Sequence, residues 1–177
     1  MVTYKFRLQF ANVDLEDFDI LEALAEIPDV MWTQDAIGVF ATATVAAVSG
    51  VQAVRQVVLA VCSAVPQAEA LRLDQDLVSI TDIADRIGVN RETVRVWANG
   101  SAKRKGKFPS PRGCVSGDIK VWGWAEVAEW LDVNLTLVYD SVPLCPKDES
   151  VANAQIAVWY SEAVDPLNKG AVVTPIA

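Results

Sequence analysis

The sequence of 177 residues contains no histidine and only three cysteines. Cys62, Cys114 and Cys145 lie far apart in the chain, so they cannot form a zinc site with the usual local spacings of cysteine and histidine ligands. We therefore expect three reduced thiols, no bound metal and no cofactor.

The signatures of a catalytic site are also missing from the sequence. There is no nucleophile beside a base, no glycine-rich phosphate loop and no cluster of metal ligands. The densest carboxylates, Asp14, Glu16, Asp17 and Asp19, lie around a predicted helix start, where the helix dipole favours negative charge. We therefore do not expect an enzyme.

Long apolar runs are absent as well. The chain has no uncharged apolar stretch of about 18 residues, the length that a membrane-spanning helix needs. Residues 1–30 lack the charged start, apolar run and small-residue cleavage site of a secretory signal. These absences favour a cytoplasmic protein that does not associate with membranes.

Charge is distributed unevenly along the chain. The net charge of −8 argues at first against a nucleic-acid partner, because phosphate backbones attract basic surfaces. However, residues 79–131 contain nine basic and six acidic residues, whereas residues 1–78 contain four and eleven, and residues 132–177 contain two and six. Positive charge is therefore concentrated in the middle third, and the sign of the face that meets DNA is what matters for binding.

The first 76 residues predict a small α+β domain. Apolar and polar residues alternate over residues 4–10, which is the period of a half-buried strand. A helix is expected over residues 14–26 with Asp14 as its N-cap, and a second helix begins after Ser49 and ends before Pro66. Further strands are expected at residues 30–33, 39–45 and 68–73.

Each of the two predicted helices has one apolar stripe. The stripe of the first consists of Leu15, Phe18, Leu21 and Leu24. The stripe of the second consists of Val51, Val54, Val58, Val61 and Val65. The order strand, helix, strand, strand, helix, strand is typical of a ferredoxin-like (βαββαβ) sandwich, which can dimerise, sense a ligand or serve as a scaffold.

A helix-turn-helix is indicated in the middle third of the chain. Ser79 to Asp82 fit a capping box that starts a short helix. Ala84, Gly88 and Val94 follow at a suitable spacing, because the alanine leaves room for the second helix, the glycine makes the sharp turn and the valine joins the shared core. Two ordinary amphipathic helices in a core are the alternative.

The second helix of this pair is the candidate recognition helix. Its arginines can bond to guanine edges or clamp phosphates, although a solvated helix face is the alternative. Glu92 would repel phosphate, so it either reads a cytosine amino group or pairs with a neighbouring arginine. With Asn90 as N-cap and the basic residues that follow, the candidate DNA-binding residues are Asn90, Arg91, Glu92, Arg95, Lys103, Arg104, Lys105, Lys107, Arg112 and Lys120.

A hairpin and a third helix complete this segment. Residues 112–115 and 119–122 flank Ser116-Gly117-Asp118, a turn that contains glycine, and form the expected wing. A closing helix over residues 124–131 can pack back on the helix pair. We expect the tryptophans of this segment to form its core and not to stack on bases, and they are Trp122, Trp124 and Trp130.

Four short motifs occur together in residues 79–131. They are Ile80-Thr81-Asp82-Ile83-Ala84, Gly88 to Arg95, Phe108-Pro109, and Trp122-Gly123-Trp124 through Trp130-Leu131. Together they resemble the MerR-like, excisionase-type winged helix-turn-helix proteins of bacteria and their phages. The resemblance implies that the second helix enters the major groove and the hairpin contacts the flanking backbone, commonly in a dimer. Gly123 departs from the family pattern, in which a basic residue is usual.

Residues 132–177 predict a C-terminal extension with one helix. An apolar run covers residues 135–139, prolines follow, and a helix is expected from Ser150 to about Ala163. Trp159 and Tyr160 on this helix either pack on the chain's own domains or form a dimer interface.

These patterns predict an α+β protein with a ferredoxin-like domain at residues 1–76 for dimerisation or sensing, a winged helix-turn-helix domain at residues 79–131, and the extension. We expect a homodimer that binds double-stranded DNA in a sequence-specific manner and regulates transcription. Excisionase-like architectural DNA binding is one alternative. A protein-interaction module in a phage or mobile-element system is another, and the acidic flanks favour it. No feature identifies a small-molecule effector.

Overall fold

The computed structural model describes residues 1–100, 104–135 and 140–164. Within these residues the chain forms six helices and two sheets, so the fold class is α+β, as predicted. None of the described helices is both long and apolar enough to cross a membrane. The elements in chain order are β1 (Val2–Ala11), α1 (Phe18–Ala25), β2 (Val30–Asp35), β3 (Gly38–Ala47), α2 (Gly50–Ala64), β4 (Glu69–Leu73), β5 (Leu77–Val78), α3 (Ile80–Ile87), α4 (Arg91–Ala98), β6 (Gly113–Val115), β7 (Ile119–Gly123), α5 (Trp124–Leu135), β8 (Val142–Pro143) and α6 (Pro146–Val164).

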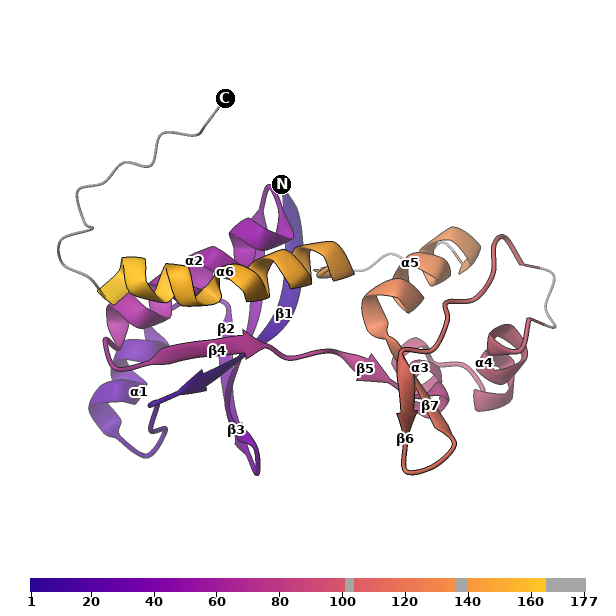
Figure 1. Cartoon of the computed structure of the whole chain (residues 1–177), viewed down its shortest axis with the longest axis horizontal. Coiled ribbons are helices and arrows are strands. Elements are labelled where there is room, and N and C mark those ends of the chain that lie inside the picture. Colours follow the sequence, from indigo (N-terminus) through magenta and orange to yellow (C-terminus); the bar gives the residue numbers. More distant parts are fainter. Residues whose placement is uncertain (101–103, 136–139, 165–177) are drawn as a thin grey trace. The chain divides into compact units, whose positions relative to one another are not determined.

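The chain divides into two compact units (Figure 1). Unit 1 contains residues 1–74 together with the described residues from Lys147 onward, and unit 2 contains residues 75–146. Helix α6 therefore shares a unit with the N-terminal elements, although it is far from them in the sequence.

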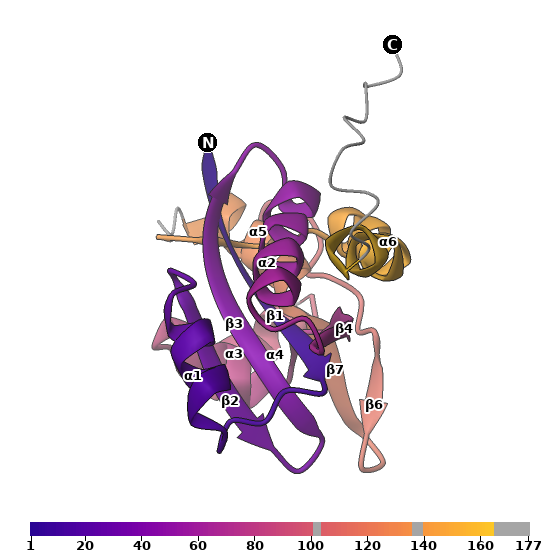
Figure 2. The same ribbon diagram turned by 90° about the vertical axis from the view of Figure 1, so that its left-hand side faces the viewer.

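Unit 1 is built around antiparallel strands in the order β2-β3-β1-β4. The central strand β1 pairs with β3 from Val2↔Ala47 to Phe10↔Val39, and its other edge pairs with β4. Helices α1 and α2 lie on one face of these strands (Figure 2). The predicted order of strands and helices in residues 1–76 is the observed order.

The core of unit 1 lies between these strands and α2. Leu8 and Phe10 of β1 are buried, and burying a side chain of this size contributes about 1.5–3 kcal/mol. The predicted valine stripe of α2 is confirmed in part: Val54, Val58 and Val61 have no exposed surface, whereas Val51 is half-buried and the buried Val65 is the C-cap, one residue beyond the helix. Ser49 is the N-cap, as expected, and its hydroxyl accepts a hydrogen bond from the backbone of Gln52 at 3.3 Å.

Helix α1 starts later than predicted. Its N-cap is Asp17, whose carboxylate accepts hydrogen bonds from the backbone N–H groups of the first turn. Asp14 instead accepts a bond from the backbone of Glu16 at 2.9 Å, within the preceding turn. The prediction of Asp14 as the cap was therefore wrong, because that carboxylate is used in a local turn before the helix begins at Phe18.

The predicted apolar stripe of α1 was wrong as well. Leu24 is buried, but Phe18 is 75% exposed and Leu21 is 40% exposed. The later start removes Leu15 from the helix, and the inward side consists of Leu24 and the half-buried Ile20, at a four-residue step.

Helix α6 starts earlier than predicted, at Pro146 instead of Ser150. Proline suits the first helical position because its fixed φ is already helical and its missing N–H is not needed there. The carboxylates of Asp148 and Glu149 in the first turn complement the helix dipole. Asp148 also accepts a hydrogen bond from the backbone of Gly50 at the start of α2, at 3.0 Å.

Helix α6 packs within unit 1. The Asn153 side chain accepts the backbone N–H of Leu73 in β4 at 2.8 Å, and Arg55 of α2 forms an ion pair with Glu162 at 2.9 Å. Trp159 is 4% exposed. It therefore packs on its own chain, which is one of the two roles that the sequence left open for it.

Unit 2 contains helices α3, α4 and α5 and a three-stranded antiparallel sheet in the order β5-β7-β6. The hairpin of β6 and β7 was expected, whereas β5 was not. Helix α5 continues to Leu135, beyond the expected end, and residues 136–139 of the predicted apolar run lie outside the described residues. The core of these elements consists of Val78, Ile83, Ala84, Val94, Trp97, Trp122, Val127, Trp130 and Leu131.

Candidate nucleic-acid interface

Helices α3 and α4 meet at a corner formed by Gly88. The predicted capping box starts α3, because Ser79 and Asp82 exchange hydrogen bonds of 2.8 and 3.3 Å. The bond that the Ser79 backbone N–H donates to the Asp82 carboxylate is the main cause of the lowered pKa of Asp82. Gly88 adopts a φ of 68°, and the Val89 N–H donates to the carbonyl of Ala84 at 3.0 Å. Glycine is favoured in this left-handed conformation, so the predicted turn is confirmed.

Helix α4 buries one side and exposes the other. Asn90 is its N-cap, as predicted, and accepts a hydrogen bond from the backbone N–H of Glu92 at 2.8 Å. Val94 and Trp97 are buried in the core of unit 2. The helical period then directs the polar side chains outward. The exposed charged residues of α4 are Arg91, Glu92 and Arg95.

Glu92 and Arg95 form an ion pair on the exposed side of α4. The Nε of Arg95 donates to the two carboxylate oxygens of Glu92 at 2.9 and 3.1 Å, and its Nη2 donates to Oε1 at 2.7 Å. These bonds lower the pKa of Glu92 and raise the pKa of Arg95. Of the two roles that the sequence left open for Glu92, pairing with a neighbouring arginine is the one observed in the unbound chain.

Residues 104–107, which follow α4, form a basic segment. Its cations are exposed, and hydrogen bonds hold its backbone in place. The backbone of Lys105 exchanges hydrogen bonds of 2.8 and 3.0 Å with the side chain of Asn134 on α5. The carbonyl of Gly106 accepts a bond from the indole N–H of Trp130 at 3.5 Å. Lys103 lies outside the described residues. The cations of the described part are Arg104, Lys105 and Lys107, and all three are exposed.

Arg104 links this segment to α4. Its guanidinium carbon lies 5.6 Å from the centroid of the Trp97 ring. An arginine within about 6 Å of a tryptophan centroid is attracted by the ring quadrupole, with a contribution of about 0.5–1 kcal/mol at exposed sites. The contact therefore places one cation of the segment against the helix that carries Arg91 and Arg95.

An aromatic cluster packs next to the basic segment. Phe108 packs edge-on against Trp122 and Trp130, with centroid distances of 6.0 and 5.0 Å. The Trp122 indole donates to the carbonyl of Pro109 at 3.0 Å. Trp130 also contacts Trp97 of α4 at 5.5 Å. Trp122 and Trp130 are thus core residues, as predicted, and they join α4, the segment and the hairpin.

The hairpin of β6 and β7 projects its turn at Ser116 and Gly117, which adopt φ values of 47° and 90°. Beside the turn, Val115 and Ile119 form a register pair and are 48% and 51% exposed. Lys120, a predicted contact residue, is exposed on β7. The hairpin thus combines an apolar tip with one exposed lysine.

Arg112 is bonded to α5. Its Nε donates to Glu126 at 3.1 Å, and its side chain is 26% exposed. A Cβ atom at Gly123 would lie 2.7 Å from this Nε, so the missing side chain makes room for the guanidinium. Gly123, which departs from the family pattern, therefore has a packing role. The Arg112 guanidinium is bonded to Glu126 of its own unit in the unbound chain.

Two further residues that join elements of unit 2 were not predicted. Asn134 anchors the basic segment. Arg86 donates two bonds of 2.7 Å to Asp76 and lies 4.8 Å from the Trp124 centroid, so it ties α3 to the start of unit 2 and to α5. Neither role has a local sequence signal, because the partners come from different elements.

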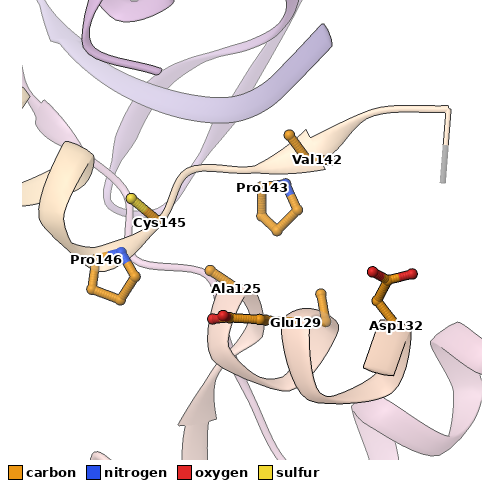
Figure 3. Close-up of a pocket in the computed structure, with 8 residues that line it drawn as sticks. Ala125, Glu129, Asp132, Val142, Pro143, Cys145 and Pro146 are labelled. Atoms are coloured by element: carbon orange, nitrogen blue, oxygen red, sulfur yellow. The ribbon is translucent and has the colours of Figure 1, made fainter. Parts of the chain in front are cut away.

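A hollow of about 390 Å³ lies elsewhere in unit 2, between α5 and the segment around β8 (Figure 3). Glu129 and Asp132 stand on its α5 side, and Val142 and Pro143 lie opposite. Among the described residues, no three His, Cys, Asp or Glu side chains are grouped so that they could hold a metal ion. The hollow offers carboxylates but none of the cations that a phosphate backbone requires.

No family model, no curated protein and no solved structure matches this chain.

Proposed function

We propose that unit 2 is a winged helix-turn-helix that binds double-stranded DNA in a sequence-specific manner and regulates transcription. In this proposal α3 and α4 are the helix pair, α4 is the recognition helix, and the hairpin of β6 and β7 is the wing. The observation that carries the proposal is the corner at Gly88, beyond which α4 buries Val94 and Trp97 and exposes Arg91 and Arg95. In helix-turn-helix proteins the N-terminal residues of the recognition helix contact base edges.

The anchored basic segment supports this proposal. Its backbone is bonded to Asn134 and Trp130, and Arg104 contacts Trp97 of α4. Because the backbone that carries these cations is held in place, less of its conformational freedom is lost when they bind phosphates. We assign the backbone contacts to Arg104, Lys105, Lys107 and Lys120, and the base contacts to Arg91 and Arg95.

For unit 1 we propose a ferredoxin-like fold that dimerises the protein or senses a ligand. The strand order and the two helices on one face support this arrangement. A dimer would present two copies of α4 to two half-sites about one helical turn of DNA apart. We place the proposed DNA binding in the cytoplasm, where the DNA partner is accessible.

The apolar tip of the wing favours a second candidate function, an architectural role like that of the excisionase-type proteins. Val115 and Ile119 are about half exposed beside the turn. Apolar side chains that enter the minor groove can insert between base steps and bend the duplex by about 20–90°. Bending of the bound duplex, measured by fluorescence resonance energy transfer between its ends, would favour this role over simple repression or activation.

Selection from a random duplex pool tests the proposed function. Full-length protein is expected to enrich one motif, and a palindromic motif would indicate a dimer. The doubly substituted control Arg91→Ala/Arg95→Ala is expected to enrich no motif. If the unaltered chain enriches no sequence over several rounds, the proposal of sequence-specific DNA binding is wrong.

A further inference from the structure

The ion pair on α4 uses only one edge of the Arg95 guanidinium. The Glu92 carboxylate accepts from Nε and Nη2 at 2.7–3.1 Å. A guanidinium also has a terminal edge, formed by its Nη1 and Nη2 groups, with hydrogens in a fixed fork. The pair leaves this terminal edge to acceptors outside the helix.

The terminal edge of an arginine matches the major-groove edge of guanine. Guanine presents O6 and N7 side by side, and they accept two hydrogen bonds from one guanidinium. An exposed arginine side chain otherwise samples many rotamers and must lose that freedom when it meets a base. Arg95 is already held through two of its nitrogen atoms, although the pair is about 60% exposed on both sides. Its orientation is therefore partly fixed before DNA binds.

We propose that Glu92 is a positioning residue that sets the sequence selectivity of α4 by holding Arg95 ready to read guanine. This inference rests on the DNA-binding function proposed above. The carboxylate acts in two ways: it orients the guanidinium, and it repels phosphate, so Arg95 is disfavoured from clamping the backbone of non-cognate DNA. Glu92 thus lowers binding to the wrong sequences more than binding to the right one.

The test uses Glu92→Gln and Glu92→Asp in the full-length chain, with the duplex enriched by selection and a random duplex as ligands. Both variants are expected to reduce the ratio of the two affinities by about tenfold. Glu92→Asp keeps the negative charge in the first turn of α4 but shortens the reach to Arg95, so it separates orientation from charge. Glu22→Gln on α1 of unit 1 is the matched control for the lost charge and should leave the ratio unchanged.

A second test replaces one guanine of the selected duplex by 7-deazaguanine, at the position whose recognition is lost in Arg95→Ala. If Glu92 only stabilised the fold, its substitution would not change the effect of this replacement on affinity. The unaltered chain is expected to lose about tenfold in affinity, because one of the two acceptors is removed. The Glu92 variants should be much less sensitive to this change, and in an Arg95→Ala background Glu92→Gln should have no effect on selectivity. Thermal unfolding of each variant confirms that unit 2 remains folded.

Loss of the positioning role of Glu92 can be told apart from a lack of DNA binding. If the unaltered chain selects a motif but both Glu92 variants keep the affinity ratio and the 7-deazaguanine penalty, the positioning role is overturned and DNA binding stands. The same holds if Glu92→Gln strengthens binding to both duplexes equally, since Glu92 then acts only as a repelling charge. If the unaltered chain binds no duplex, the proposed function itself fails.

Discussion

At the residue scale, the cations proposed to contact DNA differ in how they are supported. Arg95 lies on a helix and is oriented by Glu92, whereas Lys105 and Lys107 extend from a backbone that Asn134 anchors. Base edges carry sequence information and phosphates do not. The two groups should therefore differ in how their loss depends on the DNA sequence.

Substitution of these residues is expected to separate the two kinds of contact. Arg95→Ala should weaken binding to the selected duplex by about 1–3 kcal/mol and affect random DNA less, because a base contact is lost. Lys105→Ala and Lys107→Ala should weaken binding to both duplexes alike, and each should reduce the salt slope by roughly 0.9. Binding titrations at several salt concentrations measure both quantities. An equal loss on both duplexes for Arg95→Ala would contradict its role in base reading.

The cysteines provide a test of the packing of unit 1. Burial raises the pKa of the Cys62 thiol to about 11, and its Sγ lies 3.4 Å from the carbonyl of Ala68. The thiolate is the reactive form, so Cys62 stays protonated and inert until the pH approaches its pKa or the unit unfolds. Cys114 and Cys145 are exposed. We expect a thiol reagent at about pH 8 to modify these two in the folded chain and all three in denaturant. Cys62→Ser should remove only the slow thiol, and rapid labelling of Cys62 in the folded chain would contradict this packing.

At the element scale, the helix pair could be predicted because its signals are local. The capping box of Ser79 and Asp82, the left-handed Gly88 and the N-cap Asn90 each act within a few residues, so the sequence alone contains their geometry. Helix α1 has competing local signals, and Asp17 rather than Asp14 begins the helix.

Other elements depend on partners that lie far away in the sequence. Strand β5 exists because it pairs with β7, and the anchor at Asn134 requires α5 to meet a segment 29 residues earlier. The ion pair of Arg112 with Glu126 likewise joins the hairpin to α5. Periodicity and capping patterns contain no information on such contacts, so these features were found only in the structure.

The corner between α3 and α4 can be tested at Gly88. A Cβ atom there would meet no atom within 4 Å, so the cost of a substitution arises from the backbone φ of 68° alone. Gly88→Val should destabilise unit 2 by about 2 kcal/mol, because a β-branched residue is poorly suited to this left-handed conformation. Gly88→Asn is the matched control and should cost less, since asparagine tolerates the left-handed region. Denaturant unfolding measures both, and equal stability of the two variants would contradict a strained corner.

At the scale of the whole molecule, α6 belongs to a unit whose other elements lie in the first 74 residues. Asp148 bonds to the start of α2, and Asn153 bonds to β4. Unit 1 is therefore not complete without the C-terminal helix, and a fragment that ends at residue 75 would expose the surfaces that α6 covers.

Trp159 and its neighbour Val158 test this arrangement. Trp159→Ala should destabilise unit 1 by about 3–5 kcal/mol, because a buried tryptophan is replaced by a cavity. Val158 is 57% exposed, so Val158→Ala should change stability by no more than about 0.5 kcal/mol. Hydrogen exchange should report the loss of protection in unit 1 and not in unit 2. Full protection of α2 and β4 in Trp159→Ala would contradict the role of α6.

The salt dependence of binding tests whether unit 2 binds DNA through its basic residues. The cations assigned to phosphates lie in unit 2, while the net charge of the chain is −8. Specific binding should therefore persist despite the acidic average, and its affinity should fall linearly with salt on a double-logarithmic plot, with a slope of about −0.9 for each phosphate contact. Fluorescence anisotropy of the full-length chain with the selected duplex and a random duplex measures this. We expect tighter binding to the selected duplex and a clear negative slope on both, whereas the absence of salt-dependent binding to any duplex would contradict DNA binding by unit 2.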